Sequence, residues 1–262
     1  MANAVPRRSQ RNAGQGDTGR RSATAGSATT RSTAARAPAA AAARRPGVRE
    51  LAAQASRENI LRAAVKVFAR HGYEGGRIEK ISRAAKSYDR MIYYYFGSKE
   101  ALFIAVIEEI YRRFNEAEAR LEIDSGDPVG SLQTIVRFVW SYYRRNPEFI
   151  TLLNVENLHR GKHISKSRRA GEYSSPTIGL LDGVLRSGMA SGDFRPGLNA
   201  RDVYLMIASL GYFYLSNRHT LSVFLNEQLE TPEALAHWER FIIDAVMRQV
   251  SPALQPAHAD GD

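Results

Sequence analysis

The stretch RIEKISRAAKSYDRMIYYYFGSKEAL, residues 77–102, decides the fold of this chain. Its apolar spacing predicts a short helix over residues 77–85, then a break, then a second short helix over about residues 88–96. The preceding segment, residues 57–71, predicts a longer amphipathic helix that ends at Gly72. Two short helices joined by a tight turn and packed on a third indicate a helix-turn-helix, whose second helix would enter the major groove of DNA.

The rest of the chain also predicts helices. In four places a short polar residue precedes a proline, a pair typical of a helix start, because the polar side chain accepts from free amides and proline needs no amide partner. Ser98 and Asn199 predict two further helix starts, and no two-residue alternation indicates a strand. We therefore expect an all-α fold of about nine helices, in a small N-terminal and a larger C-terminal bundle. The four pairs are Asp127-Pro128, Asn146-Pro147, Ser175-Pro176 and Thr231-Pro232.

Positive charge is concentrated toward the N-terminus. The 262 residues have a formal net charge of +10, of which residues 1–50 carry +8, residues 51–100 carry +5 and residues 101–262 carry −3. Residues 1–50 contain no Leu, Ile, Phe, Tyr or Trp, so we expect disordered tails over residues 1–46 and 251–262. The basic tail has three readings: a solvated segment, an arm that adds affinity for phosphates, or an organellar transit peptide.

Composition excludes several classes of protein. The chain has no cysteine, which excludes disulfides, thiolate nucleophiles and zinc sites built on cysteine. No stretch reaches about 18 uninterrupted apolar residues, and the N-terminus lacks the apolar region of a secretory signal. We therefore expect a cytoplasmic protein with no membrane partner.

Three blocks of residues carry a family resemblance. They are Ile60-Leu61-x-Ala63-Ala64-x-x-Val67-Phe68 with Gly72-Tyr73, Ile81-x-x-x-Ala85, and Ile92-Tyr93-Tyr94-Tyr95-Phe96-Gly97-Ser98-Lys99-Glu100-Ala101-Leu102. In these blocks the chain resembles the tetracycline-repressor (TetR) family of bacterial transcriptional regulators, closely over about residues 57–102 and more loosely beyond them.

The resemblance implies a function and a domain organisation. It implies a sequence-specific DNA-binding regulator, which we expect to be a repressor released by a small-molecule effector, with no enzymatic activity, no cofactor and no metal. It implies a helix-turn-helix domain over residues 47–97 and a ligand-binding and dimerisation domain over residues 98–250. A homodimer would read the two half-sites of a pseudo-palindromic double-stranded operator.

The turn of the helix-turn-helix departs from the family pattern. Lys86, Ser87 and Tyr88 stand where the family usually has Gly, Val and Ser, and Gly76 replaces the usual Thr cap of the first short helix. A residue other than glycine at positive φ costs on the order of 1 kcal/mol. Either Lys86 bears that strain or the turn is built differently. The operator sequences of known members therefore do not transfer to this chain.

The second short helix carries the candidate base contacts. Arg90 can bind the O6 and N7 atoms of guanine, and Met91 and Tyr88 offer apolar contact to a thymine methyl. Asp89 has two readings, as an acceptor for the N4 amine of cytosine or as a helix cap.

Contacts to the DNA backbone come from residues on either side of the base contacts. Helical spacing turns Ile92 inward, so one of Tyr93, Tyr94 and Tyr95 packs and the others offer hydroxyls to phosphates. The resemblance implies backbone contacts for Tyr93, Tyr95 and Lys99. Lys99 stands at a helix start, where free amides also bind phosphate. Arg77 is a further candidate for the backbone.

The resemblance also implies pairing helices. Residues 199–219 fit one of them and residues 232–249 the other. In the first, small residues would allow close approach between subunits, and larger apolar residues beside them would pack; the alternative is that both stripes are core of the single subunit. The small residues are Ala208, Ser209 and Gly211, and the larger ones are Val203, Ile207, Leu210 and Tyr214.

Residues 152–163 form the most polar stretch beside an apolar helix face, and they loosely resemble the corresponding part of regulators that sense pyrimidines or nicotinate. Buried amides and carboxylates beside aromatic rings would suit a small polar aromatic or acidic effector. The alternative is a set of surface polar residues near a helix end. The candidate ligand-binding residues are Trp140, Tyr143, Asn154, Glu156, Asn157, His159 and Tyr212.

A different class, a metal-dependent helical-bundle enzyme, rests on Glu156, His159 and His163. Their spacing can place three ligands on one helix face. Such an enzyme needs a second carboxylate–histidine cluster at bundle spacing, and the sequence shows none. We therefore expect no metal site.

Overall fold

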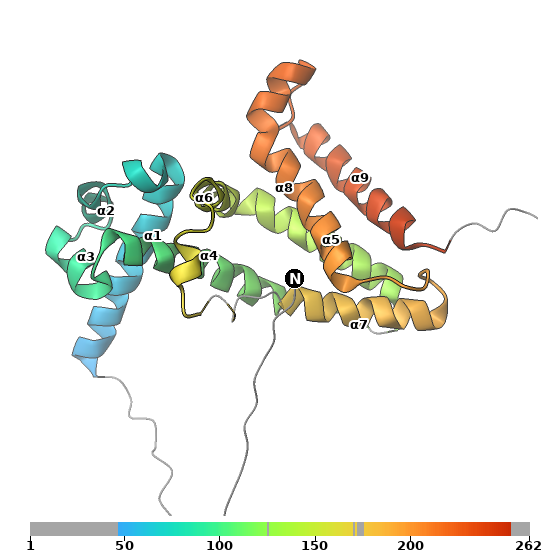
Figure 1. Cartoon of the computed structure of the whole chain (residues 1–262), viewed down its shortest axis with the longest axis horizontal. Helices are drawn as coiled ribbons and strands as arrows, with labels where there is room; N and C mark the ends of the chain where they lie inside the picture. Colours follow the sequence, from blue (N-terminus) through green and yellow to red (C-terminus); the bar gives the residue numbers. More distant parts are fainter. Residues whose placement is uncertain (1–46, 125, 170, 172–175, 253–262) are drawn as a thin grey trace, which may run out of the picture. The chain divides into compact units, whose positions relative to one another are not determined.

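The computed structural model describes residues 47–252 except 125, 170 and 172–175. The described residues contain nine α-helices, one short 3-10 helix and no strand, which confirms the predicted all-α fold (Figure 1). All described helices belong to one compact unit. The tail expected over residues 1–46 and most of the one expected over 251–262 lie outside the described residues. No helix in the described part of the chain is both long and apolar enough to cross a membrane.

The first three helices form the helix-turn-helix. They are α1 (Val48–Gly75), α2 (Ile78–Ala84) and α3 (Asp89–Phe96), and each packs on the other two. α1 begins well before the predicted residue 57, and Gly72, at φ 67°, interrupts it near the predicted end. The side chains that hold the three helices together are fully buried: Ile60, Ala64, Phe68, Ile81 and Ile92.

The turn between α2 and α3 closes as a Schellman motif. The Ser87 amide donates to the Ser82 carbonyl at 2.9 Å, and the Lys86 amide donates to the Arg83 carbonyl at 3.1 Å. Lys86 stands at φ 50°, in the left-handed region. Of the two alternatives left by the sequence, the structure selects the first: Lys86 bears the strain. The Asn59 side chain holds the turn to α1 by donating to the Ala85 carbonyl at 2.7 Å.

Replacing Lys86 by glycine should stabilise the protein. Glycine has no Cβ and adopts the left-handed conformation without strain, so Lys86→Gly should raise the free energy of unfolding by about 1 kcal/mol. Lys86→Ala removes the same charge but keeps a Cβ, and it is the matched control. Denaturant unfolding of both variants measures the difference; equal stability of the glycine and alanine variants would show that Lys86 is unstrained.

Six α-helices and a short 3-10 helix, η1, follow. α5 lies at the centre of this part, where it packs on α6, α7, α8 and α9, and α8 and α9 lie side by side (Figure 1). Trp140 of α5 and Phe114 of α4 are buried in its core. The elements are α4 (Lys99–Glu118), α5 (Pro128–Arg145), α6 (Pro147–Leu158), η1 (Ile164–Lys166), α7 (Pro176–Ser191), α8 (Ala200–Leu225) and α9 (Pro232–Val250).

Most of the predicted helix caps form. Side chains accept from first-turn amides at Ser98, Asp127, Asn199 and Thr231. The prediction is wrong at Asn146, whose side chain instead donates to the Tyr142 carbonyl at 2.9 Å. The reason is that Asn146 is the single residue between α5 and α6, so its side chain closes the first helix and does not cap the second. Ser175 lies outside the described residues.

Candidate DNA-binding surface and effector region

The outer face of α3 carries exposed aromatic rings. Tyr88, Tyr93 and Tyr94 are 71%, 51% and 77% exposed, whereas Ile92 between them is fully buried. Exposed large side chains that gather in one patch mark an interaction site more often than single ones do. Tyr95 is the tyrosine that packs inward, as the helical spacing required of one of the three, and its ring meets that of Tyr94 in a T-shaped arrangement with the centroids 5.0 Å apart.

Arg90 lies on the same exposed face. Its guanidinium lies 5.4 Å from the centre of the Tyr88 ring, so the two side chains form a cation–π pair. The pair restricts the guanidinium while its N–H groups stay available. Arg77 is exposed at the start of α2. Met91 is half-buried and packs against the core, which leaves it less surface for contact with a base.

Asp89 does not cap α3, which rules out one of the two roles weighed from the sequence. It is the first residue of α3, and its Oδ1 accepts from the hydroxyl of buried Ser82 on α2. The side chain thus ties the two short helices together and neither caps α3 nor points freely outward. Sequence reasoning missed this contact, although a polar residue on the inner side of α2 was a signal for it.

Lys99 links α4 to the end of α1. Its ammonium donates to the Glu74 carbonyl at 3.1 Å and lies 4.8 Å from the centre of the Tyr73 ring. The Lys99 charge is therefore held in place beside the helix-turn-helix, at the start of α4. A fixed positive charge beside free helix amides is suited to a phosphate.

Tyr73, near the end of α1, connects the helix-turn-helix to the rest of the chain. The Tyr73 ring lies 4.4 Å from the His163 ring and 5.5 Å from the His159 ring, measured between centroids. Phe103 of α4 packs on His163 at 4.9 Å. His159, a predicted effector residue, therefore lies in the contact between α1 and the end of α6.

Glu156 fixes the position of His163, which packs on Tyr73. Its Oε1 accepts from the backbone amides of His163 at 2.8 Å and Ile164 at 2.9 Å, and its Oε2 lies 2.7 Å from Nδ1 of the His163 ring. Glu156 is 5% exposed and His163 is 1% exposed. Buried carboxylates need such partners, and here both oxygens are used. Glu156 thus shapes the segment after α6 and has little capacity left for an effector.

The three-ligand metal reading has no support among the described residues. Glu156 and His163 meet, but His159 contacts His163 ring to ring at 5.1 Å and supplies no third ligand to a common point. No group of three His, Cys, Asp or Glu residues in the described part of the chain could hold a metal ion.

The remaining predicted effector residues do not lie together. Tyr212 of α8 donates to Oδ1 of Asn154, whose amide donates to Ser216 at 3.0 Å, so these residues join α6 to α8. Asn157 is exposed and stands apart from them. Burial raises the pKa of Tyr111 to about 12, and it also raises the pKa of Tyr143. Both hydroxyls therefore stay protonated and neutral at physiological pH.

Trp140 is also buried, and the indole N–H has no hydrogen-bond partner among the described residues. Its ring packs on the Tyr214 ring in a T-shaped arrangement, with the centroids 5.7 Å apart. An unpaired buried donor costs free energy and is uncommon in folded proteins. Trp140 therefore marks the region between α5 and α8 as one in which a polar acceptor would be stabilising.

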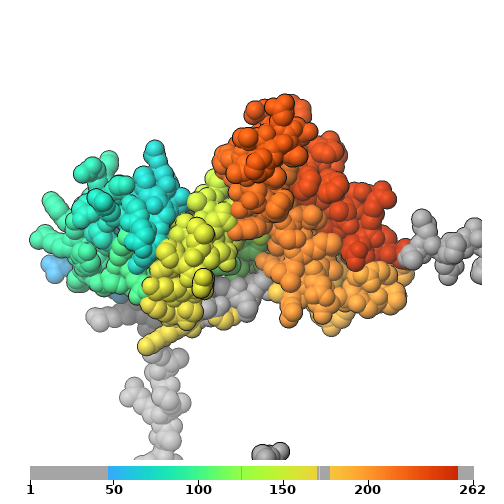
Figure 2. Space-filling model, turned by 45° about the horizontal axis from the view of Figure 1, so that its top comes forward, coloured from blue at the N-terminus to red at the C-terminus, as the bar shows by residue number. Residues whose placement is uncertain are grey.

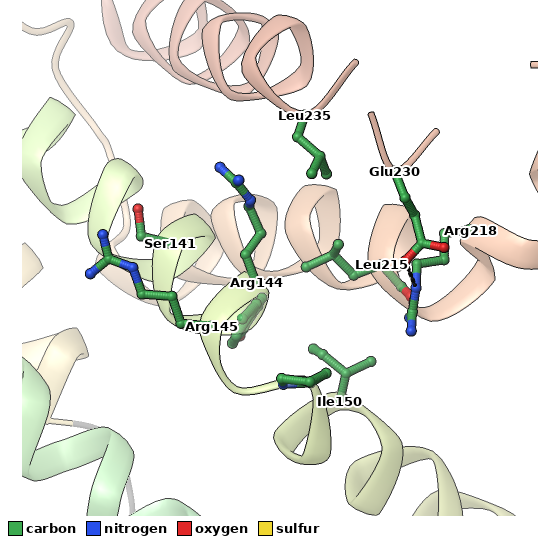
Figure 3. A pocket seen from close by; sticks show the side chains of 10 residues that line it. Ser141, Arg144, Arg145, Ile150, Leu215, Arg218, Glu230 and Leu235 are labelled. Carbon is green, nitrogen blue, oxygen red and sulfur yellow. Dashed lines mark hydrogen bonds and ion pairs between the residues drawn. The ribbon is translucent and has the colours of Figure 1, made fainter. Parts of the chain in front are cut away.

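A pocket of about 400 Å³ opens near Trp140, between α5, α6, α8 and α9 (Figure 3). Only Tyr143 of the predicted effector residues lines it. Sequence reasoning missed the pocket because its charged residues, Arg144 and Arg218, lie far apart in the chain, and only the Arg144-Arg145 pair at the end of α5 was a local signal. The lining residues are Ser141, Tyr143, Arg144, Arg145, Pro147, Ile150, Leu215, Arg218, Glu230 and Leu235.

α8 has two different faces. Gly211 packs on its own subunit, where an added Cβ would lie 3.3 Å from the Tyr143 ring, so for this residue the alternative of a core position holds. Val203, Ile207 and Tyr214 are likewise buried in the core of the single chain. The outer face instead carries exposed large apolar residues, and Figure 2 shows α8 and α9 side by side at the surface. These residues are Leu205, Phe213 and Phe224 of α8 and Phe241 of α9.

Comparisons with known proteins agree with this architecture. The family model described as "Bacterial regulatory proteins, tetR family" matches residues 60–106, and a tetracyclin repressor-like C-terminal domain matches residues 128–246. The HTH-type transcriptional repressor NicS of Pseudomonas putida is 53% identical over 205 residues, which cover 78% of this chain and 97% of NicS. The regulator RutR of Escherichia coli O157:H7 is 41% identical over 145 residues, which cover 54% of this chain and 68% of RutR.

Among solved structures, the fatty acid degradation regulator FadR from Bacillus halodurans has the same fold. The TM-score is 0.56 at 22% sequence identity, over 73% of this chain and 94% of that one. The relatives are transcriptional regulators and not enzymes, so the enzyme alternative built on Glu156, His159 and His163 is wrong. The exposed helix-turn-helix, the two family models that match residues 60–106 and 128–246, and the identity to NicS show that this chain belongs to the TetR family of bacterial transcriptional regulators.

Proposed function

We propose that this protein is a homodimeric repressor that binds a pseudo-palindromic operator and leaves it when a small molecule binds the larger helical part. The observation that carries the proposal is the outer face of α3, where the exposed Tyr88, Tyr93 and Tyr94 rings flank an available Arg90 guanidinium. NicS, which is described as a repressor, supports repression. Binding to an operator would place the protein on the chromosome in the bacterial cytoplasm.

The residues of the helix-turn-helix divide into three roles in this proposal. Arg90 reads guanine, and Tyr88 offers its ring to a thymine methyl, with Met91 contributing its exposed part. A second group contacts the DNA backbone and fixes the register of the helix. Asp89 and Tyr95 position α3 from within. The backbone group consists of Arg77, Tyr93, Tyr94 and Lys99.

Selection of genomic fragments by the purified full-length protein, at a stated salt concentration, tests this proposal. We expect enrichment of a short motif with two inverted halves, because two-fold symmetric dimers read symmetric sites. Enrichment of no motif would contradict sequence-specific binding. An enriched motif without inverted symmetry would contradict the dimer.

The exposed apolar face of α8 and α9 supports the dimer. Leu205, Phe213 and Phe224 lie on one side of α8, and Phe241 extends this side onto α9. Several exposed large apolar residues on one side of a helix are typical of a protein–protein interface. We propose that a second copy of the chain covers it, with both copies using the same surface.

Replacing Phe213 by glutamate should weaken this dimer strongly. Phe213 is 58% exposed in the single chain and central in the apolar face, so the variant would place a charge in an apolar interface. We expect the dimer dissociation constant to rise at least about thirtyfold, as for loss of an interface hot spot. Sedimentation velocity measures it. Leu158→Glu, on an 83% exposed residue of α6, is the matched control, and equal dimer constants for the two variants would contradict the proposed interface.

A further inference from the structure

The pocket between α5, α6, α8 and α9 has two arginine side chains, Arg144 and Arg218, on opposite sides of an opening that polar and apolar side chains line in nearly equal measure. We propose that this pocket binds a small organic carboxylate and is the effector site of the repressor. The proposal rests on the proposed function for its regulatory part. The sequence had placed the effector site at other residues, around Asn154 and Glu156.

The charges of the pocket favour an anion. Arg144 is 36% exposed and has one carboxylate partner, Glu239, at 3.8 Å, too far for a hydrogen bond. Arg218 is 22% exposed and donates to Glu230 at 2.7 Å. With Arg145, three guanidinium groups and two carboxylates therefore lie at or beside the pocket, and the net charge of these groups is positive.

The geometry favours Arg144 as the main contact. In Figure 3 the Arg144 side chain extends upward to the left of Leu235, whereas Arg218 and Glu230 are joined to each other at one end of the pocket. Arg145 points to the side away from Arg218. The Arg144 guanidinium also lies 5.8 Å from the centre of the buried Trp140 ring, which holds it near the pocket. A planar guanidinium with free N–H groups matches a carboxylate in two-point geometry.

The rest of the lining favours an apolar body behind the anionic group. Tyr143, Ile150, Leu215 and Leu235 supply an aromatic ring and aliphatic side chains. A volume of about 400 Å³ lies in the range of small-molecule sites. Inorganic phosphate would use the arginines but would leave these walls without a partner. A carboxylate on a ring or a short aliphatic chain satisfies both parts of the pocket.

The pocket stays accessible in the proposed dimer. On α9, Leu235 and Glu239 stand one helical turn apart on the side of the pocket, whereas Phe241 lies on another side of the helix. On α8, Leu215 is buried toward the pocket and Phe213 is exposed on the outer face. A second copy that covers the outer face would therefore leave the opening free.

The position of the pocket also provides a route to DNA release. Pro147 and Ile150, at the start of α6, line it, and the end of α6 carries Glu156, which holds His163 against Tyr73 of α1. A displacement of α6 would therefore reach the helix-turn-helix through a packed contact. A ligand shifts the protein away from the operator-bound conformation only if it binds another conformation more tightly, and a pocket at the start of α6 can supply that difference.

The probes that test this proposal are benzoate and benzamide, which have nearly the same shape and differ in charge. Methyl NMR of the full-length protein would follow Ile150, Leu215 and Leu235, which line the pocket. We expect benzoate to shift these methyl signals at millimolar concentration and benzamide to bind at least about tenfold more weakly, because it lacks the charge-assisted hydrogen bonds. Benzoate should also weaken operator binding several-fold.

A pair of arginine variants assigns the effect to the pocket. Arg144→Gln should weaken benzoate binding at least about tenfold and abolish its effect on operator binding. Arg186→Gln, which removes an exposed arginine of α7 that pairs with Asp182, is the matched control and should bind benzoate like the parent protein. Operator binding of the Arg186→Gln variant without ligand should equal that of the parent protein.

Three results would overturn the proposal. They are the absence of benzoate-induced shifts at the pocket methyl groups, equal binding of benzoate and benzamide, and benzoate binding that leaves operator affinity unchanged. Failure of the proposed function is a separate result, since it would appear as a lack of sequence-specific DNA binding in the absence of any ligand.

Discussion

Arg90→Ala should lower the affinity for the cognate operator by about ten- to a hundredfold for each half-site, while affinity for unrelated DNA changes little. The guanidinium is the one group on the outer face of α3 that can donate two hydrogen bonds to guanine, and a pair of this kind contributes about 1–3 kcal/mol of discrimination. The neighbouring Tyr88 ring restricts the side chain, so little entropy is lost on binding. Fluorescence anisotropy with operator and scrambled DNA measures both affinities.

Lys99→Ala is the counterpart of this variant. Its ammonium is fixed by the Glu74 carbonyl and the Tyr73 ring, and in the proposed complex it faces a phosphate. Loss of one phosphate contact should weaken binding to every sequence alike and reduce the salt dependence by about one unit of slope. The assignment of base reading to Arg90 and backbone contact to Lys99 fails if both variants lose the same affinity on operator and scrambled DNA.

Glu156→Ala should lower the free energy of unfolding by about 3–5 kcal/mol, because it removes the shared acceptor of several buried hydrogen bonds. The variant leaves two backbone amides, of His163 and Ile164, and the Nδ1 atom of the His163 ring without their shared acceptor. These groups lie in the contact of α6 with Tyr73 and the helix-turn-helix. Denaturant unfolding measures the loss, and operator binding of the folded variant should weaken as well.

Two further variants make this prediction specific. Glu156→Gln keeps an oxygen that can accept from the backbone amides but loses the charge, so its stability should lie between those of the alanine variant and the parent. Glu227→Ala removes an exposed carboxylate and should change stability by less than about 0.5 kcal/mol. A Glu156→Ala variant as stable as Glu227→Ala would mean that the hydrogen bonds of Glu156 do not hold the segment after α6.

The sequence predicts the helix-turn-helix well because its determinants are local. The inward positions of Ile81 and Ile92 follow from helical spacing within one short stretch, and most polar caps act on amides only a few residues away. Local spacing also required one of three consecutive tyrosines to pack inward, and the structure shows that it is Tyr95. The strain at Lys86 was visible as an alternative, but only the backbone of the turn decides it.

Contacts between distant segments could not be predicted in this way. Periodicity shows that α8 has apolar residues on several sides, but it does not show that Gly211 packs on Tyr143 while Phe213 points outward. The sequence pattern around a polar residue such as Glu156 is the same whether its side chain binds a ligand or accepts from backbone amides of its own chain. The two roles differ in which amides the fold brings close to the carboxylate. The charged pocket forms only because the fold places Arg144 of α5 and Arg218 of α8 around the same opening.

The central claim is that two copies of α3, one from each subunit of a homodimer, read two halves of one operator. Inserting about five base pairs, half a helical turn, between the halves of the selected site would place them on opposite faces of the DNA. The account predicts that the purified protein binds the original site as one dimer and loses most of its specific affinity for the lengthened site. Equal affinity for the two sites, measured at the same salt concentration, would contradict it.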